Sequence, residues 1–318
     1  MLKDKINFKV VSIVIVSFNS KEYLKNCIDS LIKYPPNLSK GEYEIIIIDN
    51  NSTDGSVKLI EDNYLNYGFI KLIKNNSNKG FAYASNQGIK ESNSKYILLL
   101  NSDTEVFEGT INGLINFMEN PGDYLISKES NNSFSNNNGK KIGIVGPKII
   151  NSDGSIQLSC RRFPSILNAA AHNILSVISP NNKFSRYYKL ADIDKNFPFK
   201  VDWISGSAMF ILREALNKIG LFDENYFMYV EDVDLCYRMW QSGYKVYYYP
   251  GVSVLHHIGK SGKENPVKSQ IMMQKSALYF YIKIYKNTWK ITLLPFVLPV
   301  LGFRILATWF KSFNIKQK

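Results

Sequence analysis

The sequence predicts an α/β protein in which a mainly parallel sheet is flanked by helices and followed by a basic, aromatic helical tail. Short runs made almost only of Ile, Val and Leu alternate with amphipathic stretches of helical length. Strands that are apolar on both sides are typical of a parallel sheet covered by helices on both faces. The 318 residues are 45% hydrophobic and 21% charged, which suits one large domain with an appendage or two modest domains.

The apolar runs predict strands at residues 10–18, 44–49, 69–73, 96–100 and 142–150. Between the first four we expect helices at 21–33, from a cap at Ser52 or Thr53 to about Glu61, and at 81–92. Residues 121–141 are rich in Asn, Ser and Lys and are expected to form a loop. Residues 203–216 predict a loop, a strand and a short helix, and a further helix is expected at 231–242, with Gly243 as its stop.

Polar residues follow three of these strands: Asn19, Asp49 and Asp103. Parallel sheets bind ligands at the carboxyl ends of their strands. A loop that merely needs polar residues would place them at either end, so their recurrence at this one end favours a ligand site. For Asp103 the functional hypothesis is a carboxylate mounted on a strand end to hold a metal or a phosphate.

The positive charge of the chain is concentrated in its tail. Residues 260–318 hold eleven lysines and arginines and a single acid, and the rest of the chain contributes little to the net charge of +12. The tail is also aromatic and aliphatic, which favours an anionic membrane surface as its partner and not nucleic acid. Residues 291–310 are long enough to span a bilayer but contain two prolines, a glycine and an arginine. A transmembrane helix, interfacial helices and an apolar cap remain possible, and the interfacial arrangement is favoured.

Several function classes are disfavoured by missing signals. The three cysteines lie far apart without CxxC spacing, which argues against a disulfide framework or a cysteine zinc site and fits a reducing compartment. The first apolar run has no small-residue cleavage site after it, so secretion is not expected. The dinucleotide, P-loop, zinc-peptidase and serine-hydrolase motifs are all absent.

Five segments, in order, resemble the motifs of family 2 glycosyltransferases: VSIVIVSFN, EIIIIDNNSTDGS, NKGFAYASNQGI, LLLNSDTEV and FMYVEDVDLCYRMWQSGY. The resemblance covers roughly residues 10–260 and is greatest to bacterial rhamnosyltransferases of cell-surface polysaccharide synthesis. It implies the Rossmann-like GT-A fold, inverting transfer and a nucleotide-sugar donor. The expected organisation is a catalytic domain at 1–259, with a nucleotide-sugar half at about 1–105 and an acceptor half at about 142–259, and a membrane-associating tail at 260–318.

The resemblance assigns donor binding to Ser17, Asn19, Asp49, Asn78, Gly80, Asn86, Asn101, Ser102 and Asp103. Asp49 would accept a hydrogen bond from the N3–H of uracil or thymine, which implies a dTDP- or UDP-sugar. Helix capping is the alternative role of this carboxylate. Asn50 stands where many relatives carry a second aspartate, and the segment from Asn78 to Asn86 also fits an ordinary turn and helix.

A divalent metal, Mg²⁺ or Mn²⁺, is the implied cofactor, because it would offset the charge of the leaving diphosphate. Asn101-Ser102-Asp103 stands at the family's DxD position and keeps only the last carboxylate as a ligand. His256 is the second expected ligand, because Gly259 and Ser261 follow it at the family's offsets, which they do not for His257. A structural histidine is the alternative.

The resemblance places the catalytic base at Asp232, with Glu231 as the second choice. Inverting transfer needs one base to deprotonate the acceptor hydroxyl and no enzyme nucleophile. Acids in the first turn of a helix also complement its dipole, which is the ordinary explanation of this cluster. Helical rotation turns Asp234 away from Asp232, and we expect it to be solvated.

Acceptor binding is assigned to Trp203, Gly206 and Ser207 by the same resemblance. Trp203 could stack on a sugar ring or simply be a buried tryptophan, and small residues in the turn would let a sugar approach the backbone. Arg161 and Arg162 could contact an acceptor phosphate or be ordinary solvated residues.

The sequence therefore predicts an inverting glycosyltransferase that moves a sugar, with rhamnose from dTDP-rhamnose as the leading candidate, onto a glycan or lipid-linked acceptor. It would be cytoplasmic and peripheral on the inner face of the cell membrane. A sugar-1-phosphate nucleotidylyltransferase is one rival, but the first strand is not followed by the glycine- and arginine-rich loop that it needs. A non-catalytic membrane-surface adaptor is another, and the intact Asp49, Asp103 and Asp232 argue against it.

Overall fold

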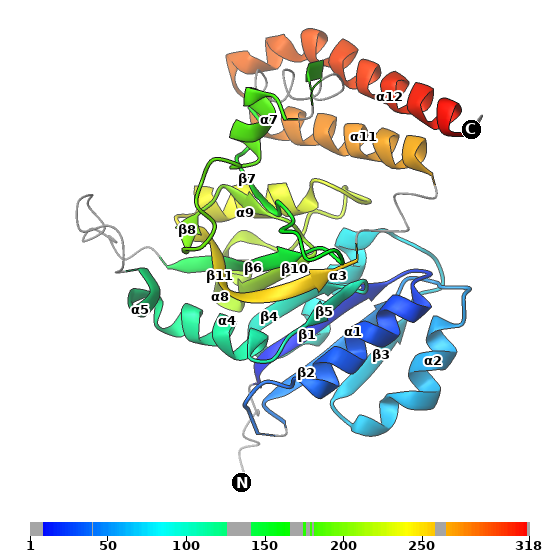
Figure 1. Cartoon of the computed structure of the whole chain (residues 1–318), viewed down its shortest axis with the longest axis vertical. Coiled ribbons are helices and arrows are strands. Elements are labelled where there is room, and N and C mark those ends of the chain that lie inside the picture. Colours follow the sequence, from blue (N-terminus) through cyan, green and yellow to red (C-terminus); the bar gives the residue numbers. More distant parts are fainter. Residues whose placement is uncertain are drawn as a thin grey trace.

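The computed structural model describes residues 9–39, 41–125, 141–165, 174–175, 179, 181–257 and 265–316 (Figure 1). Within these residues a nine-stranded sheet has the order β3-β2-β1-β4-β10-β6-β11-β5, with β8 paired to β11. Its strands are β1 (Lys9–Ser17), β2 (Tyr43–Asp49), β3 (Ile70–Lys74), β4 (Ser94–Asn101), β5 (Thr104–Val106), β6 (Ile142–Ile150), β8 (Phe199–Lys200), β10 (Ala208–Leu212) and β11 (Lys245–His256). A two-stranded sheet joins β7 (Cys160–Arg161) to β9 (Trp203–Ile204).

The first four strands are parallel, as predicted, and each lies within two residues of its expected bounds. Ser17 is opposite Asp49 on β2, and Val16 is opposite Asn101 on β4. The polar residues that end these strands therefore lie side by side at one edge of the sheet. We call this edge the carboxyl edge.

Ten α-helices are described: α1 (Lys21–Lys33), α2 (Ser56–Asn63), α3 (Phe81–Glu91), α4 (Thr110–Glu119), α5 (Pro121–Leu125), α7 (Lys183–Tyr188), α8 (Arg213–Ile219), α9 (Glu231–Gln241), α11 (Pro266–Tyr285) and α12 (Leu294–Lys316). Short 3-10 segments are η1 (Leu65–Tyr67) and η2 (Trp289–Leu293). The helix at 21–33 has its predicted bounds. The expected loop at 121–141 begins instead with α5, and residues 126–140 lie outside the described residues.

The predicted cap of the second helix is wrong. This helix, α2, begins at Ser56, and its cap is Gly55, whose φ is +87°. Ser52 and Thr53 instead donate backbone hydrogen bonds to the side chains of Asp49 and Asn19. These two residues therefore shape the loop after β2, and the helix cap lies two or three residues later than predicted.

Two apolar cores lie on opposite faces of the sheet. Along β1, Ile13 and Ile15 belong to the core that α1, α2 and α4 cover, whereas Val14 belongs to the core that α3, α8, α9 and α11 cover. Alternate residues of a strand point to opposite faces, so burial on both faces explains why β1, β2 and β4 are apolar almost throughout. The result is the predicted α/β architecture.

The second half of the sheet is mixed. Strand β10 runs antiparallel to both neighbours, β4 and β6. Because of this direction, the turn before β10 lies at the carboxyl edge of β4, where the Ser207 carbonyl accepts a 3.0 Å hydrogen bond from the N–H of Asn101. The turn at residues 205–207 is thereby held beside the ends of the parallel strands.

The last two helices form a pair over the face that α9 covers (Figure 1). Phe280 of α11 is 1% exposed and belongs to the second core. Helix α12 packs on α11 through Val297 and Leu301 and exposes most of its other large apolar side chains. In the described part of the chain, Trp289–Phe313 is the stretch long and apolar enough to cross a membrane by length and composition. The boundary predicted at 259/260 stays a prediction.

Candidate active site

The predicted base-reading residue, Asp49, ends β2 and is 1% exposed. Its Oδ2 accepts a 2.9 Å hydrogen bond from the N–H of Ser52. Its Oδ1 is buried and has no hydrogen-bond partner among the described residues. A buried carboxylate oxygen without a partner is costly, so such an oxygen is a ready acceptor for an N–H group of a ligand.

A chain of hydroxyl groups connects the ends of β1 and β4. The Oγ of Ser17 lies 3.1 Å from the Oγ of Ser20, which donates a 2.8 Å hydrogen bond to Ser102. Asn19, with a φ of +49°, accepts a 2.8 Å hydrogen bond from the N–H of Thr53. The loops after β1, β2 and β4 are therefore held together by Ser17, Asn19 and Ser102, which were assigned to donor binding, and by Ser20, which was not.

Asn50 holds the loop after β3. It is 2% exposed, and its Nδ2 donates to Asn78 Oδ1 at 2.9 Å and to the Gly80 carbonyl at 3.2 Å. Its Oδ1 accepts a 3.1 Å hydrogen bond from Asn75. An aspartate could not donate the first two bonds, so the amide at this position fits its role as an organiser of the loop that carries Asn78.

Gly80 and Asn86 connect the nucleotide half to the segment that precedes α9. Gly80 has a φ of +93°, and a Cβ on it would lie 2.3 Å from the Phe227 carbonyl oxygen, so only glycine fits there. The Asn86 amide bonds to the backbone of Phe222 (2.9 and 3.0 Å) and to Glu224 (2.8 Å). In this structure both residues position that segment, and a direct contact with the donor stays a prediction.

Asp103 and His256 come together, as the metal hypothesis requires. Asp103 Oδ1 lies 3.2 Å from His256 Nε2, and the other ring nitrogen of His256 lies 2.9 Å from Gln157 Oε1. His257 instead faces Glu105 at 2.6 Å. The contact with Gln157 leaves Nε2 directed at Asp103, and such an outer partner commonly orients a metal-binding imidazole.

Few side chains at this position could ligate a metal ion. Among the described residues there is no group of three or more His, Cys, Asp or Glu that could hold a metal ion. An imidazole nitrogen and a carboxylate oxygen about 3 Å apart fit neighbouring ligands of an ion with bonds of about 2.1 Å. Any further ligands would have to come from substrate or water. Gly259 and Ser261, which pointed to His256, lie outside the described residues.

The predicted base, Asp232, lies in the first turn of α9. Its Oδ2 accepts a 2.9 Å hydrogen bond from the N–H of Gly206, and its Oδ1 accepts a 2.8 Å hydrogen bond from the N–H of Val233. Burial raises the pKa of Asp232, while these two N–H groups and the charge of Arg161 act to lower it. The carboxylate is thus enclosed but supported in its ionised form.

Glu231 is the more strongly perturbed member of the pair. It is 6% exposed, and its Oε2 has no hydrogen-bond partner among the described residues. Burial, and then the neighbouring Asp232, raise the pKa of Glu231 to about 8. Two adjacent buried carboxyl groups share one proton most easily, and these surroundings favour the proton on Glu231 and the charge on Asp232.

A strained turn sets the position of this pair. Tyr229 and Val230, directly before α9, both have φ of +70°, and a β-branched residue rarely adopts such a conformation. The turn is fixed from two sides: the N–H of Phe81 donates to the Phe227 carbonyl at 2.8 Å, and Ser276 of α11 donates to the Met228 carbonyl at 2.9 Å. Strain of this kind persists only where the surroundings enforce it.

The expectation that Asp234 is solvated is wrong. It is 1% exposed and pairs at 2.7 Å with both Arg238 and Lys283. Lys283 also lies 2.6 Å from Asp223. Asp234 does turn away from Asp232, but the side to which it turns is covered by α11, so it joins a buried ion network.

The predicted acceptor-binding residues differ in whether they contact Asp232. Gly206 donates to it directly, and Ser207 has a buried Oγ without a partner in the described part of the chain. Trp203 is 5% exposed, and its Nε1 donates a 2.9 Å hydrogen bond to the Arg162 carbonyl. The Arg161 guanidinium lies 5.1 Å from the centre of the Trp203 ring. Little of the indole is left open for sugar stacking, which stays a prediction.

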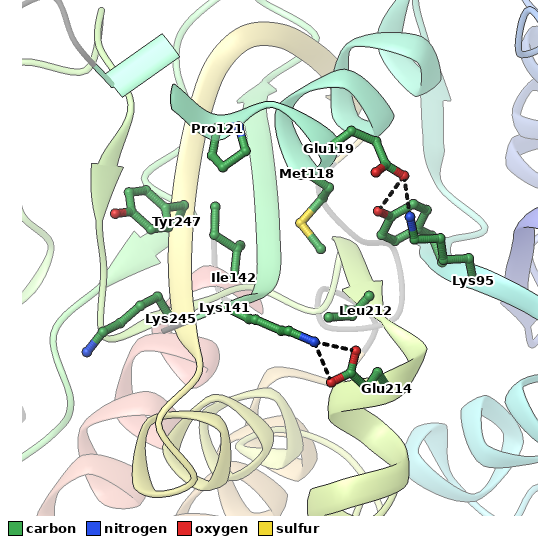
Figure 2. Close-up of a pocket in the computed structure, with 11 residues that line it drawn as sticks. Lys95, Met118, Glu119, Pro121, Lys141, Ile142, Leu212, Glu214, Lys245 and Tyr247 are labelled. Carbon is green, nitrogen blue, oxygen red and sulfur yellow. Dashed lines mark hydrogen bonds and ion pairs between the residues drawn. The ribbon is translucent and has the colours of Figure 1, made fainter. Parts of the chain in front are cut away.

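The cavity in Figure 2, with a volume of about 310 Å³, lies at the opposite edge of the sheet from these residues. It adjoins the start of β4 and of β6, and none of the predicted site residues lines it. Two pairs of its charges neutralise each other: Lys95 with Glu119 at 2.6 Å, and Lys141 with Glu214 at 2.8 Å (Figure 2). We therefore place the site at the carboxyl edge.

The comparison with protein families agrees with this geometry. The model of the family described as Glycosyl transferase family 2 matches residues 12–219, more than half of the chain. The chain belongs to glycosyl transferase family 2. The matched range includes Asp49, Asp103 and the turn at 205–207, while α9 follows it.

Two relatives of this family 2 glycosyltransferase transfer rhamnose. The N-acetylglucosaminyl-diphospho-decaprenol L-rhamnosyltransferase of Mycobacterium tuberculosis is 26% identical over 292 residues, covering 88% of this chain and 87% of that protein. The rhamnosyltransferase WbbL of Escherichia coli is 25% identical over 254 residues, covering 78% and 83%. The similarity to rhamnosyltransferases inferred from the motifs is thus confirmed.

Solved structures confirm the fold. The mannosyltransferase PcManGT of Pyrobaculum calidifontis, in complex with GDP-Man and Mn²⁺, superposes with a TM-score of 0.57 over 93% of this chain and 74% of that one, at 14% identity. TarS 1–349 of S. aureus superposes with a TM-score of 0.52 over 93% and 71%, at 15% identity. The family 2 chain therefore has the predicted GT-A architecture, and it is a glycosyltransferase.

Proposed function

We propose that this enzyme transfers a sugar, with inversion, from a dTDP- or UDP-sugar to a lipid-linked or glycan acceptor in cell-surface polysaccharide synthesis. Rhamnose is the proposed sugar, because both rhamnosyltransferase relatives match most of the chain. The observation that carries the proposal is the turn at 205–207. It bonds on one side to the end of β4, next to Asp103, and on the other to Asp232.

The donor would lie along the carboxyl edge. The Oδ1 of Asp49, which has no partner among the described residues, would accept the N3–H of uracil or thymine. Mg²⁺ or Mn²⁺ would be held by Asp103 and His256, and when bound it would supply positive charge to the leaving diphosphate. The Ser17–Ser20–Ser102 hydroxyl chain would hold the loops that border the diphosphate.

The chemistry at the acceptor needs a single base. Asp232 would take the proton of the acceptor hydroxyl as its oxygen attacks the anomeric carbon, and the bond to the diphosphate would break with its electrons leaving on the phosphate oxygen. The N–H groups of Gly206 and Val233 fix the carboxylate that receives the proton. Glu231, protonated at neutral pH, adds no second negative charge.

We also propose that the enzyme is cytoplasmic and lies at the inner face of the cell membrane. Helix α12 exposes large apolar side chains, among them Phe296, Leu306 and Phe310 at 75%, 58% and 59%. The basic tail would add attraction to anionic lipids. An interfacial position of α12 would keep the catalytic domain in the cytoplasm, where nucleotide-sugars are made.

The test is turnover and binding across a panel of nucleotide-sugars, with and without Mg²⁺ or Mn²⁺, using the full chain and a lipid-linked acceptor. We expect metal-dependent preference for dTDP-rhamnose, lost in Asp103→Ala. Preference for another nucleotide-sugar would overturn rhamnose alone. Failure to bind any donor would contradict the transferase mechanism, and release of diphosphate from a nucleoside triphosphate would support the nucleotidylyltransferase instead.

A further inference from the structure

Three cationic side chains extend from the proposed base, Asp232, to the apolar helix α12, and the charges of two of them act on the third. They are Arg161 on β7, Lys189 directly after α7, and Arg304 on α12. The mechanism above uses none of them as a ligand-binding group. In Figure 1, β7 lies between α9 and the α11–α12 pair, and α7 lies beside one end of that pair.

Arg161 is fixed by aromatic rings beside the base. Its guanidinium lies 5.1 Å from the centre of the Trp203 ring and 5.8 Å from that of Tyr188. It lies close enough to Asp232 to act on that carboxylate through its charge. Its Nε is buried and has no hydrogen-bond partner among the described residues. The guanidinium is thus preorganised, with a donor that no described residue uses.

Lys189 and Arg304 extend the cluster to α12. Lys189 directly follows Tyr188, over which Arg161 lies, and is partly buried. Arg304 is partly buried and follows Leu301 by three residues, so it lies near the face of α12 that packs on Tyr281. Burial lowers the pKa of Lys189, and the charges of Arg161 and Arg304 lower it further.

For Arg161 and Lys189 this arrangement is unfavourable as it stands. Like charges brought together in a partly buried place repel, and their desolvation adds to the cost. Among the described residues no carboxylate forms an ion pair with Arg161 or Lys189. The exposed Arg186 of α7, by contrast, pairs with Asp192. A bound anion would remove the repulsion, and planar guanidinium groups are suited to phosphate oxygens.

We infer that Arg161, Lys189 and Arg304 form a binding site for the diphosphate of an isoprenoid diphosphate acceptor. The inference rests on the proposed function, because it places the acceptor's linking diphosphate between Asp232, which meets the sugar hydroxyl, and α12, which meets the lipid. Arg161 and Lys189, which form no ion pair with a described carboxylate, would supply the positive charge that a diphosphate needs. The site is separate from the donor diphosphate, which belongs at Asp103 on the carboxyl edge.

The experiment measures binding, so that it does not depend on turnover. Farnesyl diphosphate is titrated into the full chain in EDTA, which removes metal from the donor position, and the change in tryptophan fluorescence is followed. We expect saturable binding that Arg161→Gln and Lys189→Gln each weaken by about tenfold or more. Arg161→Lys should recover part of the loss. Lys183→Gln, an exposed cation of α7, is the matched control and should bind like the wild type.

Other probes distinguish the source of the anion. Inorganic pyrophosphate should compete with farnesyl diphosphate, whereas farnesol should not. Vesicles of phosphatidylglycerol should bind the two Gln variants as well as they bind the wild type, because membrane contact is assigned to α12. Equal weakening by Lys183→Gln, unchanged binding in both Arg161→Gln and Lys189→Gln, or loss of vesicle binding in these variants would overturn the inference.

The proposed function can fail separately. It fails if no nucleotide-sugar binds in the presence of metal, and this measurement does not involve the cation cluster. A variant that no longer melts cooperatively is set aside in favour of the other, since Arg161 and Lys189 lie on different segments.

Discussion

The backbone N–H of Gly206 donates a 2.9 Å hydrogen bond to the carboxylate of Asp232. One residue later, the Ser207 carbonyl accepts a 3.0 Å hydrogen bond from Asn101 at the end of β4. The position of the proposed base relative to the proposed donor edge is therefore set by backbone atoms. Backbone positioning suits a reaction in which the attacking oxygen must approach along one line.

Asp232→Asn should lower kcat by roughly 10²–10⁴-fold, because an amide cannot take the acceptor proton. The carboxamide oxygen can still accept one of the two backbone hydrogen bonds, so the fold should remain. The measurement is steady-state turnover with the melting temperature and donor Kd as controls. A variant that keeps more than a tenth of the wild-type kcat would remove Asp232 from the base role.

Asp49→Asn should weaken binding of a uridine or thymidine diphosphate by about tenfold. The substitution can place an N–H₂ group where Oδ1 now offers a buried, unpaired acceptor. Calorimetric titration with dTDP or UDP checks this. Asp54→Asn is the control, because Asp54 bonds to Ser56 and Lys21 within the protein. Equal losses of affinity in both variants would indicate a general disturbance of the loop.

Asp103→Asn and His256→Gln should each raise the metal concentration needed for half-maximal activity by about 10–100-fold. The reason is that these two side chains are the protein's proposed ligands, 3.2 Å apart. His257→Gln is the matched control, since His257 faces Glu105, and it should change this concentration little. Titration of Mn²⁺ into metal-free enzyme gives the three values. A larger effect of His257→Gln would reverse the assignment.

Glu231→Gln should stabilise the protein at alkaline pH. The folded-state pKa of Glu231 is raised to about 8, from an ordinary value of 4.5. A raised carboxyl pKa contributes stability below pH 4.5, and this contribution is lost as the pH rises towards 8. Gln resembles the protonated form, so Tm should exceed the wild-type value by about 2 °C or more at pH 8.5 and match it near pH 4.5. A difference in Tm that is the same at both pH values would contradict this cause, and Glu22→Gln, at an exposed position, serves as the control.

Lys283→Met should destabilise the fold by about 2–3 kcal/mol, because it removes the cation that the buried Asp234 shares with the partly buried Asp223. This loss is smaller than the roughly 3–5 kcal/mol expected for fully buried pairs, because Lys283 is 30% exposed and Arg238 still pairs with Asp234. Urea unfolding measures the loss, and Lys286→Met, at an exposed position of the same tail, should change stability by less than about 0.5 kcal/mol. Equal effects of the two substitutions would mean that the ion network does not attach α11 to α9.

The elements that the sequence predicts well are those whose signals are local. The strands at β1, β2 and β4 are apolar on both faces, and α1 has a clear amphipathic pattern, so their bounds follow from nearby residues. The pairing of Asp103 with His256 was also predicted, because a family motif surrounds each of them. None of these inferences needs knowledge of distant contacts.

Other features depend on partners far along the chain. Asn86 bonds to Phe222, 136 residues away, and no local pattern indicates this. Asp234 looks solvated on an isolated helix, and only the position of α11 shows that Lys283 covers it. The cap at Gly55 was missed because Ser52 has the better capping side chain. Its Oγ, however, already accepts a 2.9 Å hydrogen bond from the N–H of Asn19.

The left-handed conformations of Tyr229 and Val230 have a consequence for the evolution and engineering of this enzyme. Glycine at Val230 would relieve strain of about 1–3 kcal/mol, so a screen for thermal stability should select it readily. The same change would let the first turn of α9 move, and with it the carboxylate that must meet the acceptor. At this turn, selection for thermal stability and selection for a higher turnover rate favour different residues.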